Sequence, residues 1–310
     1  MPAALPWYQR PWVVSLLCAA PLLACYLTTT APDLTWAHSN EDSGDLVTAA
    51  YLWGIPHPTG YPFYLLTCRL LMVLLPVGTI AFRAHCYSIL MGLLGSCLLG
   101  QACRRMAPHV FPEAVESPND PHAILLQVAA TLLAGASFTV WSQSIIAEVY
   151  AANYAFLGAL LLMLSWYLVA KEPRERSRAL VWYAGTLGLA LTNHLTSAYM
   201  GVVGLAVLAW TRRLPPPTAW PRTVLIFVAP LSLYLFLLVR SRANPPLDWT
   251  NTETLPNLYL HMTGKQFRYL LLGQEPGQVL RRLFLEMDFL HEYGPLLSLL
   301  MLLGVGWSLV

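Results

Sequence analysis

Residues 62–82 read PFYLLTCRLLMVLLPVGTIAF, and this stretch decides how the rest of the chain is arranged. It is long enough to cross a bilayer, for which a helix needs about 20 apolar residues. It also carries Arg69 near its middle and Pro76 near its end. A charge at bilayer depth is costly, and a proline interrupts a helix. If the stretch crosses the membrane, every later loop changes sides; if it lies along the surface, none does.

The composition is that of a polytopic membrane protein. Of the 310 residues, 56% are hydrophobic and 11% are charged, which is typical of a chain buried in lipid. A net charge of +2 is too small to indicate a nucleic-acid partner. The six cysteines show no metal-ligand or disulfide spacing and are interpreted as packing residues. We therefore expect an all-α fold, a polytopic bundle of membrane helices.

Uncharged runs predict the spans. Five such runs lie between the charged residues at 10 and 33, 83 and 104, 120 and 148, 148 and 171, and 222 and 240. Residues 179–211 are long enough for two short spans hinged at 192–196, and 295–310 predict a further span. Because the chain stops inside that last run, we expect residues 1–310 to form one transmembrane module, the N-terminal part of a longer protein.

The basic residues decide the sidedness. If 62–82 lies on the surface, the basic residues of three later loops join Arg10 on the cytoplasmic side; they are Arg104, Arg105, Lys171, Arg174, Arg176, Arg178, Arg212, Arg213 and Arg222. The loops at 31–60, 142–148 and 192–196 hold no Lys or Arg and then face the other side. The positive-inside rule favours this arrangement. Residues 31–82 are therefore predicted to be a first external loop with interfacial helices.

The polar residues of that loop are the first candidates for chemistry. Residues 40–45 read NEDSGD, and three carboxylates beside a membrane span are costly unless they are used. Asp42 opens an amphipathic helix, with Leu46, Ala49, Ala50 and Trp53 at helical spacing. Gly54 is expected to end this helix. Asp42 and Asp45 either cap the helix or take part in catalysis, and the local pattern leaves both open.

Three further polar positions are expected on the same side. Residues 57–62, HPTGYP, form a turn that is either a rigid corner or a holder for His57 and Tyr61 near a phosphate or sugar. Glu148, followed by Tyr150, stands alone between two uncharged runs, where an ionisable residue is a functional candidate. His194 lies at the predicted hinge, where it either caps helix ends or contacts a ligand.

The stretch 240–268 is the longest polar segment. Arg242 and Lys265 in this stretch are candidates for holding a phosphate. The alternative is that Arg240 and Arg242 only extend toward the headgroups at a helix end.

These motifs occur in the order of a known family: DSGD at 42–45, HPTGYP at 57–62, WSQ–AEVY at 141–150, NHLT at 193–196 and DW at 248–249. Over about residues 10–270 the chain resembles a transmembrane-260-like family of multi-pass membrane proteins with D-S-G-E and H-P-P-G-Y-P motifs. That family is similar to the protein O-mannosyltransferases of the GT-C superfamily of membrane glycosyltransferases. Two positions depart from its pattern, Asp45 in place of Glu and Pro58-Thr59 in place of Pro-Pro.

The resemblance implies a GT-C-like fold and a set of site residues. Asp42 matches the catalytic carboxylate of the first external loop, and Glu148 matches the second acidic position. The substrate-binding candidates are Asp45, His57, Tyr61, Tyr150, His194, Arg242 and Lys265. No metal ligand is expected, and no cofactor apart from a polyprenyl-phosphate sugar as donor substrate.

The function expected from this resemblance is that of an inverting membrane glycosyltransferase. It would move a sugar, mannose before others, from a polyprenyl-phosphate donor to an acceptor hydroxyl of a protein Ser or Thr or of a glycan. Asp42 would be the general base, Glu148 would orient a substrate, and His57, Arg242 and Lys265 would stabilise the departing phosphate. The site would face the periplasm of a bacterial inner membrane or the lumen of the endoplasmic reticulum. The expected partners are the lipid-linked donor, the acceptor and membrane lipids, without nucleic acid.

A second class of function stays open at this stage. A multi-pass transporter or lipid-binding scaffold would also carry a few external charges. Transporters often contain internal repeats, and the sequence shows no convincing repeat.

Overall fold

The computed structural model describes residues 6–214, 216–265, 277 and 292–294, and within these residues the regular elements are helices. A single isolated β-bridge joins Ile55 to Asp248. The prediction of an all-α membrane protein is confirmed. The span expected at 295–310 lies outside the described residues.

Among the described residues, four helical segments are long and apolar enough to cross a membrane. Three are α1 (Pro11–Thr29), α4 (Ile80–Val110) and α7 (Val149–Val169). The fourth, Pro217–Ser241, joins α10 (Trp220–Val228) to α11 (Leu235–Ser241) through short 3-10 turns. α5 (Pro121–Ala136) and α6 (Phe138–Ser144) become a fifth only if counted together, and they are bent by 63°. The uncharged run between residues 120 and 148 is thus a broken segment rather than one straight span.

The predicted hinge after residue 191 is also present. α8 (Pro173–Leu191) and α9 (Ala198–Thr211) are separated by residues 192–197, which include a 3-10 turn at Leu195–Ser197. α8 begins with a charged turn, and α9 is a shorter apolar helix.

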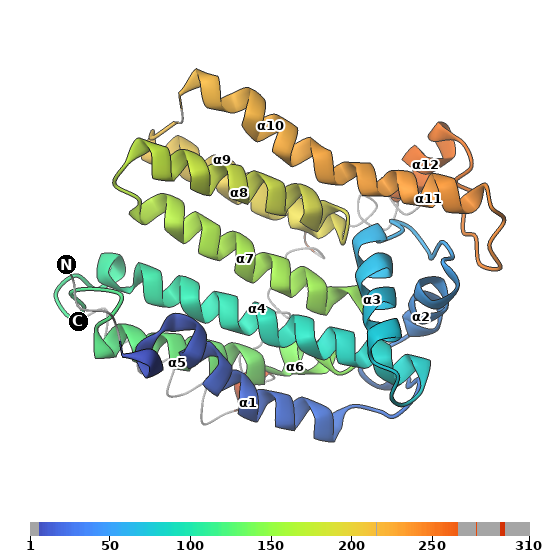
Figure 1. Cartoon of the computed structure of the whole chain (residues 1–310), viewed down its shortest axis with the longest axis horizontal. Coiled ribbons are helices and arrows are strands. Elements are labelled where there is room, and N and C mark those ends of the chain that lie inside the picture. Colours follow the sequence, from blue (N-terminus) through green and yellow to red (C-terminus); the bar gives the residue numbers. More distant parts are fainter. Residues whose placement is uncertain (1–5, 215, 266–276, 278–291, 295–310) are drawn as a thin grey trace.

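α3 (Pro62–Leu74) is the helix on which the sidedness depends. It has 13 residues, so at 1.5 Å per residue it is about 20 Å long, shorter than a hydrocarbon core of about 30 Å. Figure 1 shows it running across the ends of α4 and α7, with α2 (Ser43–Leu52) beside it. It ends two residues before Pro76. That this helix lies along the membrane surface stays a prediction.

α2 packs as its spacing predicted, but it ends differently. Leu46, Ala49 and Ala50 are fully buried. The left-handed residue at its C-terminus is Trp53, with φ 56°, instead of Gly54. Gly54 is needed for another reason: a Cβ there would lie 2.9 Å from the backbone oxygen of Leu247. The prediction that Gly54 ends the helix by its backbone conformation was therefore wrong by one residue.

The chain separates polar loops from basic loops at opposite ends of the bundle (Figure 1). We call the end where residues 31–61, 137–148, 192–197 and 241–265 meet the site end. Backbone hydrogen bonds connect these segments, from Phe63 N to Thr192 O (3.2 Å) and from Ile55 N to Leu247 O (2.9 Å). The C-terminal part of α4, which carries Arg104, and the connections from α7 to α8 and from α9 to α10 lie at the other end, the basic end. The grouping predicted by counting Lys and Arg is the one observed.

Close helix contacts fix one half of the bundle. A Cβ on Gly158 of α7 would lie 2.6 Å from the backbone oxygen of Gly95 on α4, so the two backbones touch. Small residues allow such approach between membrane helices. Near the basic end, buried Arg104 of α4 donates to Gln127 of α5 at 3.0 Å, and Gln127 donates to Ser15 of α1 at 3.0 Å. α1, α4, α5 and α7 thereby form a compact group.

The turn before α3 packs closely against two later helices. Gly60 has φ +87°, and a Cβ there would lie 2.5 Å from Leu237 of α11 and 2.9 Å from His261 of α12 (Leu255–Met262). Only glycine adopts this conformation at low cost.

The sidedness can be tested by labelling. Single cysteines introduced at Arg174 and Glu253, both exposed, in a background without the six native cysteines should react from opposite sides of the membrane with an impermeant maleimide. The reason is that residue 174 lies at the basic end and residue 253 at the site end. Reaction of both from one side would refute the arrangement.

The Gly60 turn provides a stability test. Gly60→Ala should lower the free energy of unfolding by about 2 kcal/mol or more, because the new methyl group meets Leu237 and His261 in a strained backbone conformation. Gly44→Ala in α2 is the matched control, since its Cβ would have no atom within 4 Å. Thermal unfolding in detergent measures both. Equal melting temperatures for the two variants would contradict the close contact at Gly60.

Candidate functional site

A hydrogen bond ties the first loop to the loop before α7. Ser43 Oγ donates to the backbone oxygen of Ala147 at 2.9 Å, and both residues are buried. Ser43 follows Asp42, and Ala147 precedes Glu148. The bond therefore places the two predicted catalytic carboxylates in one region of the site end, although they are far apart in sequence. The side chain of Asn40, also buried, contacts the same hydroxyl.

Asp45, His57 and Tyr61 form a continuous series of hydrogen bonds. Asp45 Oδ2 lies 2.7 Å from His57 Nδ1 and also accepts the His57 backbone N–H at 2.9 Å. Asp45 Oδ1 accepts from Trp249 Nε1 at 3.1 Å. His57 Nε2 lies 2.9 Å from the Tyr61 hydroxyl. The carboxylate of Asp45 is thus committed to holding His57 in place, and it does not cap α2.

The hydrogen-bond pattern favours a doubly protonated His57. The Tyr61 hydroxyl lies 3.0 Å from the Pro58 backbone oxygen and donates its one proton there. His57 Nε2 must then carry a proton to bond with Tyr61, while Nδ1 donates to Asp45. Burial lowers the pKa of His57, but the hydrogen bond to Asp45 and the charges of Asp42, Asp45 and Glu148 outweigh it, and the net shift is upward. The hydrogen-bond pattern and the upward pKa shift both favour the imidazolium form of His57 beside these carboxylates.

Asp42 is the exposed carboxylate of the group. Its side chain is 57% exposed, and its Oδ2 lies 3.7 Å from His57 Nε2. It stands at the N-terminal cap position of α2 without a capping hydrogen bond from its side chain within the described structure. Asp42 thus occupies the N-cap position, as one of the two predictions stated, but its side chain makes no capping bond and is exposed to solvent.

Glu148 is buried, in contrast to Asp42. It is 4% exposed and precedes the first residue of α7, where its Oε2 accepts the Val149 N–H at 3.3 Å. Burial, together with the charge of Asp42, raises its pKa to about 7 from 4.5, although the Val149 hydrogen bond and His57 act in the opposite direction. Near neutral pH this carboxyl is divided between its acid and its ionised form. A perturbed carboxyl beside other polar groups is typical of a functional site.

Aromatic rings line one side of the group. The Tyr61 ring stacks on His194 with an interplanar angle of 4° and centroids 5.9 Å apart. Tyr150, at the start of α7, lies 5.4 Å from His194 and is 48% exposed. His194 Nδ1 also accepts the Thr196 N–H, so this residue caps the 3-10 turn at Leu195–Ser197. It therefore caps a helical turn and also lies in the site. Burial, then the charge of His57, lowers the pKa of His194 to about 4, so it is neutral.

Two predicted residues stand apart from this group. Arg242 donates from Nε to the Glu253 backbone oxygen at 2.9 Å, and Lys265 is exposed. Neither forms a hydrogen bond or ion pair with Asp42, His57 or Glu148 in the described part of the chain. Arg240 donates to the Trp53 backbone oxygen at 2.9 Å, so it supports the first loop. A phosphate-binding role for Arg242 and Lys265 stays a prediction.

Three supporting residues, Ser43, Trp249 and His261, have no individual role predicted from the sequence. Ser43 and Trp249 lie inside quoted motifs, and His261 lies in the polar segment 240–268; those positions were the available signal. Asn193, next to His194 at the predicted hinge, is buried and donates to the Val149 backbone oxygen at 3.1 Å, so it joins the α8–α9 hinge to the start of α7.

Glu148 gives a test of the site's electrostatics. Because its pKa is raised from 4.5 to about 7, the folded protein holds this proton more tightly than the unfolded chain does. Its contribution to stability is full below pH 4.5 and is lost as the pH rises to about 7. We expect the difference in unfolding free energy between Glu148→Gln and wild type to move in favour of the variant by about 3 kcal/mol from pH 4.5 to pH 8. Thermal unfolding across this range measures it.

The control for that experiment is Glu41→Gln, which neutralises an exposed carboxylate in the neighbouring loop. Its stability should follow wild type. Parallel curves for wild type and Glu148→Gln would exclude a raised pKa at Glu148.

The chain is similar in sequence to known proteins. The chain matches the profile of the family described as "Protein O-mannosyl-transferase TMEM260 N-terminal domain" over residues 42–215. It is 30% identical over 270 residues to protein O-mannosyl-transferase TMEM260 of Mus musculus, an alignment covering 84% of this chain and 35% of the relative. It is 23% identical over 257 residues to protein O-mannosyl-transferase tmem260 of Dictyostelium discoideum, covering 78% of this chain and 30% of the relative. No solved structure matches it.

The chain spans about a third of the length of these curated relatives. The segment matched by the family profile begins at Asp42, includes His57, Glu148 and His194, and ends before Arg242. It covers more than half of the chain. The chain therefore belongs to the family of the protein O-mannosyl-transferase TMEM260 N-terminal domain.

Proposed function

We propose that this protein is a membrane glycosyltransferase that moves mannose from a polyprenyl-phosphate donor to an acceptor hydroxyl. Two observations support the proposal: the family to which the chain belongs, and the gathering of Asp42, His57 and Glu148 at one end of the bundle. The proposed mechanism rests on the second observation. The acceptor is a Ser or Thr hydroxyl of a protein, or a glycan hydroxyl.

The proposed reaction is a single displacement with inversion at the anomeric carbon. The acceptor oxygen forms a bond to that carbon while the bond from the carbon to the phosphate oxygen breaks. The electron pair of the broken bond leaves with polyprenyl phosphate. Asp42 takes the proton of the acceptor hydroxyl, and such a positioned base contributes typically about 10²–10⁴-fold to the rate. Its 57% exposure leaves it open to an acceptor arriving from water.

His57 is suited to the leaving phosphate. Negative charge grows on that group in the transition state, and a fixed cation there lowers the barrier. Asp45 accepts the backbone N–H of His57 and contacts Nδ1 of its imidazole, as described above. The position of the imidazole is therefore set before substrate binds. Arg242 and Lys265 stay secondary candidates for the same task.

Glu148 and the aromatic side chains are proposed to place the sugar. In its acid form Glu148 donates a hydrogen bond to a sugar oxygen and adds no second negative charge beside Asp42. Tyr61, His194 and Tyr150 present ring surfaces with polar atoms at their edges, which suits a ring with apolar and polar faces. The side chain of Asp45 is one methylene shorter than the Glu of the family motif. It stays bonded to His57 and does not reach the substrate.

The membrane arrangement suits a lipid-linked donor. The polyprenyl tail would lie in the bilayer between helices, with its phosphate at the site end. By the positive-inside rule this end faces away from the cytoplasm, toward a bacterial periplasm or the lumen of the endoplasmic reticulum.

Asp42→Asn tests the base. We expect mannose transfer to fall by about 10²–10⁴-fold, because the amide cannot accept the acceptor proton. Glu41→Gln, one residue away and exposed, is the matched control and should keep wild-type activity. The measurement uses purified protein with a panel of radiolabelled polyprenyl-phosphate sugars and counts label transferred to secreted-protein acceptors. A folded Asp42→Asn protein with unchanged transfer would refute the base assignment.

A further inference from the structure

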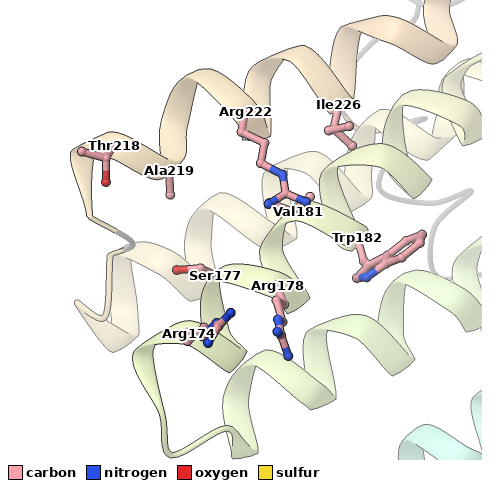
Figure 2. A pocket seen from close by; sticks show the side chains of 9 residues that line it. All are labelled: Arg174, Ser177, Arg178, Val181, Trp182, Thr218, Ala219, Arg222 and Ile226. Carbon is pink, nitrogen blue, oxygen red and sulfur yellow. The ribbon is translucent and has the colours of Figure 1, made fainter.

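A cavity lined by arginines and apolar side chains lies at the basic end, away from Asp42 and Glu148 (Figure 2). Its volume is about 540 Å³, and it lies between α8 and α10. Three arginines line it, Arg174 and Arg178 from α8 and Arg222 from the start of α10. Figure 2 shows Arg222 reaching from α10 toward α8.

The cavity lies beside the place where α8 and α10 touch. A Cβ on Gly185 of α8 would lie 2.8 Å from Ile226 of α10, and one on Gly188 would overlap the Phe227 backbone oxygen. α8 and α10 are thus in close contact near their C-terminal ends. The space opens beyond this contact, on the side of Arg178 and Arg222.

The three arginines have no counter-charge in the described structure. None of them forms a hydrogen bond or an ion pair with a described residue. Glu172 and Glu175 stand at the start of α8, but neither pairs with them. Three guanidinium groups around one cavity repel each other and create a field that attracts an anion.

The other lining residues indicate what kind of anion fits. Arginine binds phosphate through paired N–H groups. Trp182, which is 61% exposed, and Val181 and Ile226 line the same cavity with apolar surface. Tryptophan favours the headgroup level of a bilayer, and basic pockets between membrane helices on the cytoplasmic side suit lipid headgroups. A free phosphate would use the arginines and leave this apolar lining without a partner.

We propose that this cavity binds the phosphate headgroup of an anionic phospholipid. Arg174, Arg178 and Arg222 hold the phosphate, and Trp182 and Ile226 lie against the start of the acyl chains. The site is independent of mannose transfer, because it is built from other residues at the opposite end of the bundle.

Native mass spectrometry of the purified protein in detergent tests the proposal. Phosphatidylglycerol, phosphatidylcholine and inorganic phosphate are added separately, and bound copies are counted. The wild-type protein should bind phosphatidylglycerol in preference to phosphatidylcholine. The double variant Arg178→Gln/Arg222→Gln should bind phosphatidylglycerol at least about tenfold more weakly, because two charge-assisted contacts are lost.

The control is Arg212→Gln/Arg213→Gln, which removes the same charge from exposed residues at the same end but outside the cavity. It should bind phosphatidylglycerol like wild type. Equal loss in the two double variants would refute a defined site in favour of general surface charge. Competition by millimolar inorganic phosphate as strong as that by phosphatidylglycerol would refute the lipid as ligand.

A third variant guards against misfolding of the charge variants. Val181→Trp keeps all three arginines and fills the cavity with a larger side chain. It should also weaken phosphatidylglycerol binding about tenfold by exclusion. Unchanged binding in a folded Val181→Trp protein would overturn the assignment.

Discussion

A helix too short to cross the bilayer is the constraint on which the candidate site depends. α3 has 13 residues and lies across the ends of α4 and α7, so the chain enters and leaves the first loop at the same end (Figure 1). If α3 crossed instead, Asp42 and Glu148 would be separated by the thickness of the membrane. The Ser43–Ala147 hydrogen bond could not form in that case. The chemistry of the site is thus a consequence of helix length.

The site divides its carboxylates by environment. Asp45 is occupied by His57 and Trp249, Glu148 is buried, and Asp42 is left open to solvent. This division follows from position on α2: a residue three places after Asp42 points inward toward the turn at His57, whereas Asp42 stands at the helix start. Two acidic residues of a single motif therefore have different surroundings, and of these two only Asp42 is open to solvent.

Much of this arrangement is predictable from sequence, because it depends on composition and spacing. The absence of Lys and Arg from 31–60, 142–148 and 192–196 predicts which loops meet, and the spacing of Leu46, Ala49 and Ala50 predicts the buried face of α2. What could not be predicted are contacts made between distant segments. The bond from Trp249 to Asp45 joins residues 204 positions apart, and Gly54 is needed because of Leu247. Neither contact produces a pattern among residues that are close together in the sequence.

The backbone contact between α4 and α7 has a mechanical consequence for a protein that is proposed to take up a long isoprenoid chain. Where Gly95 meets Gly158, the two backbones touch, and the side chains of Tyr154 and Leu98 pack beside the contact. At this level the two helices leave no gap for a lipid tail. An apolar cavity of about 230 Å³ lies elsewhere between the same two helices, and α7, α8, α9 and α10 line another of about 330 Å³ on the other flank; both offer apolar room for part of the proposed lipid tail.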